Sequence, residues 1–146
     1  MVRHYADGKD LADDITTLAA RHPQDRVGVI VNSLRMAADL MRRLERAGLA
    51  REPQLYSSTA SAGRYRDLDL ARPGVVVHRA SAKGLDFDTV VIADAESESA
   101  TDPTEAALRM AYYVMITSAR ERLVLGWRGS RPPRHLTGLE GWVRTR

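Results

Sequence analysis

Short apolar runs alternate with amphipathic segments along this chain, and that alternation constrains the fold more than any other feature. Three runs are short, rich in β-branched residues and apolar almost throughout: Val27–Val31, Gly74–His78 and Thr89–Ala93. Runs of this kind are typical of parallel strands that are covered on both faces. Leu123–Leu125 reads as a last strand and Gln54–Tyr56 as a short one. The sequence therefore predicts an α/β domain, with a parallel sheet and helices on both faces.

Two helices are predicted before the midpoint of the chain. The first begins near Gly8 and ends before Pro23, because the residue before a proline disfavours helix. The second follows Asn32 and Ser33, whose side chains can cap its first turn, and Gly48 supplies the left-handed residue that ends it. Its predicted buried stripe consists of Ala37, Leu40, Met41 and Leu44.

A third helix has a complete start signature. Asp102 is the predicted N-cap, Pro103 occupies the first helical position and Glu105 completes a capping box. Its predicted inner face consists of Ala107, Met110, Ala111 and Val114. Beyond the last strand, Arg131-Pro132-Pro133 interrupts regular structure, and we expect residues 131–146 to form a closing tail on one domain that spans residues 1–146.

Composition sets limits on the environment and the partners of this chain. It has 146 residues, no cysteine and a formal net charge of +3. Without cysteine it has neither disulfides nor thiolate metal sites, and no apolar run approaches the ~20 residues of a membrane span. We therefore expect a cytoplasmic protein without membrane contact. The modest positive charge permits nucleic-acid binding without demonstrating it. The four histidines, His4, His22, His78 and His135, show no metal-ligand spacing.

One segment between two predicted strands, Ala80–Asp88, has the composition of a binding loop. Small residues let a phosphate or a ribose approach the backbone, Lys83 supplies positive charge, and Asp86 can accept hydrogen bonds from sugar hydroxyls. Phe87, the sole phenylalanine, would anchor the loop in the core. The alternative is a tight connection in which Lys83 is merely solvated. Because ligands of parallel sheets bind at the carboxyl ends of strands, we expect the site in the loops after Val31, His78 and Ala93.

Two segments resemble motifs of one protein family. Ser81-Ala82-Lys83-Gly84-Leu85-Asp86-Phe87-Asp88 is similar to motif V of the UvrD/Rep-like superfamily 1 DNA helicases, S-A-K-G-L-E-F, and Tyr113–Leu123 is similar to motif VI, Y-V-A-L-T-R-A-R-E-R-L. Val29–Ser33 resembles the strand and helix start that open the same domain. The resemblance covers about Val27 to Trp127 and points to the C-terminal RecA-like domain of such a helicase.

That resemblance implies a role in a two-domain motor. Two RecA-like domains hold ATP between them and step along single-stranded DNA. On this reading Ser81, Lys83 and His78 contact nucleic acid, while Gly84 and Asp86 contact the nucleotide. ATP and Mg²⁺ would bind only when an N-terminal P-loop domain, in cis or in trans, completes the site. Single-stranded DNA is the implied partner, together with the machinery of DNA repair or transcription.

The chain departs from the family pattern at several positions. No G-x-x-x-x-G-K-[ST] phosphate loop occurs, so the chain is not a complete ATPase. Ser118 stands where motif VI has its finger arginine, a group worth ~10³–10⁵ in rate. Arg120 is a weak substitute, because two residues along a helix are ~200° of rotation. We therefore assign no catalytic residue.

Other positions also differ from the family pattern or need an interpretation of their own. His78 and Ala80 stand where the family usually has threonine and histidine, and the family's N-Y-R-S segment is not found. Asp86 is one methylene shorter than the family's glutamate. Asp94-Ala95-Glu96 is interpreted as an exposed acidic turn.

Two hypotheses remain after this comparison. The chain is the C-terminal motor domain of a UvrD/Rep-like helicase, or it is a degenerate helicase-like module that binds protein or nucleic acid without hydrolysing ATP. For the second hypothesis, Trp127 and Trp142 matter: they either pack the tail against the sheet, which we favour, or mark an exposed docking patch.

Overall fold

The computed structural model describes residues 1–48, 54–56, 75–78, 81–97, 104–130 and 133. Within these residues the elements are β1 (Val2–His4), α1 (Gly8–Arg21), β2 (Val27–Val31), α2 (Leu34–Arg46), β3 (Gln54–Tyr56), β4 (Val75–His78), β5 (Phe87–Ile92), α3 (Glu105–Thr117) and β6 (Ala119–Trp127). The strands form one sheet in the order β1-β6-β5-β2-β4-β3, and every described pair is parallel. The predicted fold class is confirmed.

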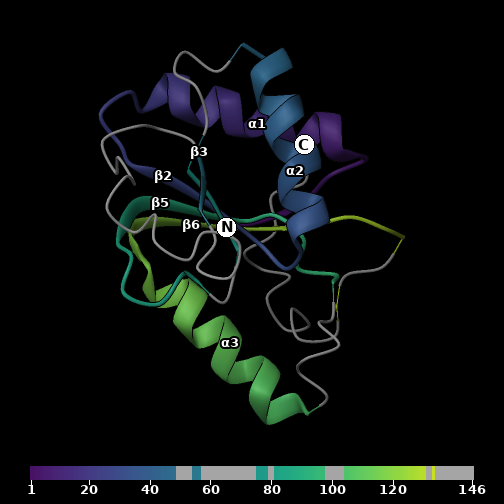
Figure 1. Cartoon of the computed structure of the whole chain (residues 1–146), viewed down its shortest axis with the longest axis vertical. Helices are drawn as coiled ribbons and strands as arrows, with labels where there is room; N and C mark the ends of the chain where they lie inside the picture. Colours follow the sequence, from purple (N-terminus) through teal and green to yellow (C-terminus); the bar gives the residue numbers. More distant parts are fainter. Residues whose placement is uncertain (49–53, 57–74, 79–80, 98–103, 131–132, 134–146) are drawn as a thin grey trace.

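Helices cover both faces of this sheet, as Figure 1 shows, with α1 and α2 on one face and α3 on the other. Residues on alternating sides of the central strands therefore belong to two cores. Val29 and Val31 of β2 pack with α1 and α2, whereas Ile30 packs with the cluster that contains Met115 of α3. All three side chains are fully buried. This two-sided burial explains why β2 is apolar at every position except Gly28.

The first half of the chain follows the sequence prediction closely. Helix α1 ends at Arg21, just before Pro23, and α2 is capped by Ser33, whose hydroxyl accepts the amide hydrogen of Met36 at 3.1 Å. Gly48 has a φ of 74°, the left-handed conformation expected after a helix. Strand β1 was not predicted. Its three residues include Arg3 and His4 and carry no apolar run, yet Val2 is buried and pairs with Leu125 of β6.

Helix α3 corrects two predictions. Its N-cap is Thr104, which accepts the amide hydrogen of Ala107 at 3.2 Å, and not Asp102, which with Pro103 lies outside the described residues. The predicted inner face is wrong in part: Met110 is 63% exposed, and Tyr112 and Met115 are buried instead. The other three predicted residues, Ala107, Ala111 and Val114, are partly buried. Apolar residues lie on more than one side of this helix, so periodicity alone could not select the buried side.

Packing of Phe87 against β2 explains an otherwise unusual glycine in a central strand. A Cβ atom added at Gly28 would lie 2.5 Å from the Phe87 ring, which real contacts do not reach. The ring is fully buried, as predicted for the anchor of the binding loop. Gly28 and Phe87 thus fix the start of β5 over the centre of the sheet.

The last strand ends at a buried tryptophan. Trp127 lies beside the His4 ring, with 4.3 Å between ring centroids and 47° between the ring planes, so it is not part of an exposed patch. Whether it packs the tail against the sheet stays a prediction. Trp142 and the predicted tail from residue 134 onward lie outside the described residues. Among the helices that are described, none is long and apolar enough to cross a membrane.

Candidate functional site

The segment that resembles motif V contains a tight turn. The Leu85 amide donates to the Ala82 carbonyl at 3.1 Å, and Gly84 has a φ of 82°. A positive φ at the third position of a four-residue turn is the signature of type II, and glycine is the residue that adopts it without strain. Lys83 and Gly84 are exposed at the corner of this turn, while Ser81 and Ala82 are buried beneath it.

This turn is fastened to the end of α3 and the start of β6, the segment that resembles motif VI. The Ser118 hydroxyl lies 3.3 Å from the Ala82 carbonyl oxygen and 3.1 Å from that of Val114. The Phe87 amide donates to the Ser118 carbonyl at 2.9 Å. Two segments about thirty residues apart in the sequence therefore form one structural unit.

Arg120, two residues after Ser118, also contacts the motif V segment. Helix α3 ends at Thr117 and β6 begins at Ala119, so Arg120 extends from a strand and not from a helix. Its guanidinium donates to Asp86 at 2.9 Å, and both side chains are about half exposed. The rotation argument against Arg120 therefore does not apply here. Ser118, in contrast, is buried under the turn, and a long cation at that position would not fit without rearrangement.

The position of this unit corrects the expected location of the site. Phe87 pairs with Ala119 at the amino ends of β5 and β6, so Gly84 and Asp86 lie near the amino edge of the sheet. The reason is topological: β4 and β5 both run parallel to β2, so the connection between them must return from the carboxyl edge to the amino edge. The backbone of His78 stays at the carboxyl edge, paired with Val31. The five candidate residues therefore do not form a single cluster.

Asp94 is the residue whose surroundings the sequence analysis misjudged most. It is 1% exposed, and not part of an exposed turn. Its two carboxylate oxygens each lie 3.2 Å from the Asn32 amide nitrogen, and the Asn32 side chain donates to the Asp94 carbonyl at 3.1 Å. Burial raises the pKa of Asp94 to about 7, and the nearby Glu96 carboxylate acts in the same direction. No periodicity signal distinguishes such a buried carboxyl from a surface one.

Asp94 lines a polar pocket at the carboxyl edge, with a volume of about 440 Å³. The pocket lies where β2, β5 and β6 end and where α2 begins. Ser33, Arg35 and Arg42 of the α2 segment form one side, and Ser97 and Arg128 form the other. Arg128 is held by Glu96, whose carboxylate accepts from the guanidinium at 2.9 Å and from the Arg128 amide at 3.1 Å. This is one of the loop regions in which a ligand was expected.

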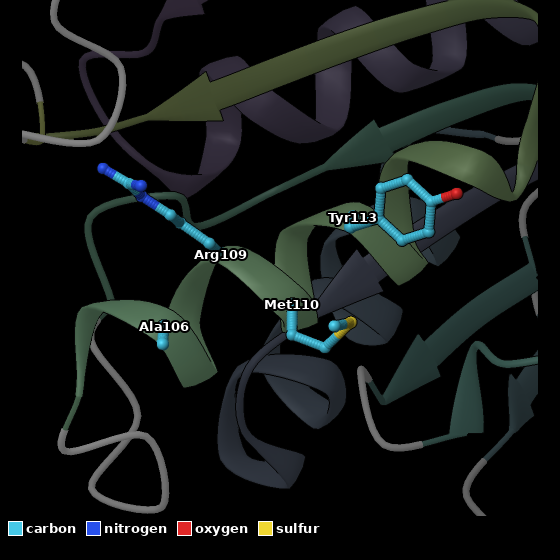
Figure 2. A pocket seen from close by; sticks show the side chains of 4 residues that line it. All are labelled: Ala106, Arg109, Met110 and Tyr113. Atoms are coloured by element: carbon cyan, nitrogen blue, oxygen red, sulfur yellow. The ribbon is translucent and has the colours of Figure 1, made fainter.

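A second hollow is apolar and lies on the outer face of α3. Figure 2 shows Ala106, Arg109, Met110 and Tyr113 lining it from successive turns of the helix. Met110 and Tyr113 are 63% and 65% exposed, which is unusual for side chains of this size. Among the described residues, no group of three or more His, Cys, Asp or Glu side chains could hold a metal ion.

Comparison with solved structures places this architecture. The chain is similar to the C-terminal domain of a possible DNA helicase from Lactobacillus plantarum WCFS1, with 24% identity over 90% of this chain and 75% of that one, and a TM-score of 0.63. It is also similar to a structure of the E. coli DEAD-box protein SrmB bound to regulator of ribonuclease activity A, with 12% identity over 99% of this chain and 88% of that one, and a TM-score of 0.54. The chain has the RecA-like fold of helicase C-terminal domains. No protein-family model and no curated protein matches its sequence.

Proposed function

We propose that this chain is the C-terminal motor domain of an ATP-dependent DNA helicase of the UvrD/Rep type, inactive in ATP hydrolysis by itself. The observation that carries the proposal is the joining of the two helicase-like segments. They lie about thirty residues apart in the sequence, and the Ala82–Ser118, Phe87–Ser118 and Asp86–Arg120 contacts bring them together. The RecA-like fold is consistent with this assignment.

The proposed roles divide the candidate residues between a nucleotide and a nucleic acid. Gly84 and Asp86, near the amino edge, would face a nucleotide held by an N-terminal P-loop domain, with Mg²⁺ bound mainly by that domain. Gly84 suits this role because it is exposed and has no Cβ atom, so a ligand can come close to its backbone. Asp86 would have to exchange its Arg120 partner for a ribose hydroxyl. Lys83 and Ser81 would serve the nucleic acid through the turn, and the His78 position would do so from the carboxyl edge.

Binding of single-stranded DNA tests this proposal. Lys83→Ala should lower the slope of log K against log salt concentration by about one, because one phosphate contact is lost. Lys9→Ala is the matched control: it removes the other lysine of the chain, which lies on α1 and pairs with Asp13 at 2.7 Å. Fluorescence anisotropy with a labelled oligonucleotide gives both slopes. Equal slopes for Lys83→Ala and the parent chain would show that Lys83 does not contact the DNA backbone.

A second candidate function is favoured by two specific observations. Position 118 holds a buried serine and not a finger arginine, and α3 exposes Met110 and Tyr113. We infer from these that a non-hydrolysing module, which binds protein or nucleic acid, is the alternative to a working motor half. The same titration separates the motor half from the protein-binding form of this alternative: a motor half binds DNA with a steep dependence on salt, whereas a protein-binding module binds DNA weakly even at low salt.

A further inference from the structure

The polar pocket at the carboxyl edge has an excess of positive charge. Arg35, Arg42 and Arg128 line it, whereas its lining carboxylates are Asp39 and Asp94. Asp39 is already engaged by Arg43, whose Nε atom lies 2.7 Å away, and Arg128 is balanced by Glu96. Asp94 carries only part of a negative charge near neutral pH, because burial raises its pKa to about 7. Arg35 and Arg42 therefore set the net sign of the pocket.

The guanidinium groups at the rim are available to a ligand. Arg35 is exposed and makes no ion pair with any residue in the described part of the chain. Arg42 is 65% exposed and lies 3.5 Å from Asp39, which prefers Arg43. The two arginines are seven residues apart, which is two turns, so they emerge on the same side of α2. Guanidinium groups that converge on a cavity without matching carboxylates are the usual means of binding phosphate.

The backbone at the same place favours an anion as well. Helix α2 begins in the pocket, with its N-cap Ser33 in the lining. The amides of a first helical turn have no partner within the helix, and the helix dipole adds partial positive charge there. Asp94 holds the Asn32 amide and thereby fixes the angle at which α2 leaves β2. Three strand ends thus contribute to the pocket. Arg35, Arg42 and the start of α2 follow β2, Asp94 follows β5, and Arg128 follows β6.

We propose that this pocket binds a phosphate group, held by Arg35, Arg42 and Arg128, and that on the proposed function this is a phosphate of the nucleic-acid backbone. The nucleotide candidates Gly84 and Asp86 lie near the other edge of the sheet. The two edges are separated by the length of β5, which is five residue steps from Phe87 to Ile92, or about 16 Å. The pocket instead shares its edge with the His78 position, and β4 lies directly beside β2. A nucleic-acid strand that crosses the carboxyl edge would meet both the pocket and the His78 position.

The test measures DNA binding and phosphate binding separately, on the full chain. Arg35→Ala and Arg42→Ala should each weaken binding of a labelled oligonucleotide roughly 10- to 100-fold, as expected for a lost charge-assisted contact. Because both arginines hold the same phosphate, the double variant should lower the salt slope by about one and not by two. Arg21→Ala is the matched control, since it removes an exposed arginine from the last turn of α1, which leads to the amino end of β2 and not to the pocket. In a parallel arm, inorganic phosphate is titrated while the amide NMR signals of Asn32, Ser33 and Arg35 are followed.

Each outcome decides a separate point. Loss of DNA affinity in the Arg35 and Arg42 variants, with Arg21→Ala unchanged, supports the pocket with nucleic acid as its source of phosphate. Amide shifts with inorganic phosphate but no DNA binding support the pocket with free phosphate as its ligand and count against the proposed function. DNA binding that depends on Lys83 but not on Arg35 and Arg42 overturns the pocket and leaves the proposed function standing. If the chain neither binds DNA nor shows amide shifts with inorganic phosphate, the pocket is not a phosphate site.

Discussion

At the scale of single residues, this domain depends on a few positions that local sequence rules do not distinguish. Gly28 gives space to the Phe87 ring, Ser118 ties the turn to α3, and Asp94 clamps the start of α2. The sequence identified Phe87 as an anchor, because one large aromatic residue in a loop of small ones needs a core to occupy. It could not identify the glycine opposite, since the contact joins residues about sixty positions apart.

The glycine leads to a stability prediction. Gly28→Ala should lower the free energy of unfolding by about 1–3 kcal/mol, because the added Cβ atom would overlap the fully buried Phe87 ring. Gly8→Ala is the control, since its Cβ atom would meet only the flexible end of Arg43. Urea denaturation measures both. A parental midpoint for Gly28→Ala would mean that the ring does not pack there.

The buried carboxyl leads to a prediction about pH. Burial raises the pKa of Asp94 from its ordinary value of 3.8 to about 7 in the folded chain, so the folded state holds its proton more tightly than the unfolded state does. The stability that this proton contributes is present below about pH 4 and is lost as pH rises to about 7, on the order of 2–4 kcal/mol. Asp94→Asn should flatten that decline in urea denaturation at pH 5 and pH 8. The same decline in the variant would assign it to other groups.

At the scale of elements, the sequence predicted two kinds well: helices with a single buried apolar stripe, and strands that are buried on both faces. Helices α1 and α2 carry a single stripe, and β2 is apolar apart from Gly28, so pattern alone fixes them. Strand β5 begins at Phe87, two residues before the predicted start, because Asp88 and Thr89 interrupt its apolar run. Helix α3 was placed correctly but rotated wrongly, because Met110 and Tyr113 extend its apolar surface beyond the buried side. A three-residue edge strand such as β1 carries too little pattern to be detected and depends on β6 for its pairing.

The junction of α3 and β6 can be tested by restoring the family's residue. Ser118→Arg should lower the free energy of unfolding by about 2–4 kcal/mol, because a guanidinium would be forced under the turn at a position that is 4% exposed. Thr117→Arg places the same side chain on the neighbouring, exposed position and should be nearly neutral. Thermal unfolding of both variants compares them. If Ser118→Arg were as stable as Thr117→Arg, the junction would have room for a finger arginine after all.

At the scale of the whole molecule, the sheet separates two sets of candidate contacts. The turn at Lys83 and Gly84 lies near the amino edge with Arg120, and the arginine-lined pocket lies at the carboxyl edge with the His78 backbone. The sequence predicted the fold class, but it placed all ligands at one edge, and the binding segment stays a prediction. The return of the chain to the amino edge between β4 and β5 follows from the parallel sheet that the sequence did predict. The error came from treating the whole segment as part of the strand end before it.

The most direct test of the account is an anisotropy titration of labelled single-stranded DNA with the unmodified chain at 50 mM and 200 mM salt, as a rough choice of range. We expect binding that weakens steeply between the two concentrations and does not require ATP, because this chain lacks the phosphate loop. Such a result would identify a nucleic-acid-binding motor half and direct the search to its P-loop partner. No binding at either concentration would contradict the account and leave the protein-binding module as the better description.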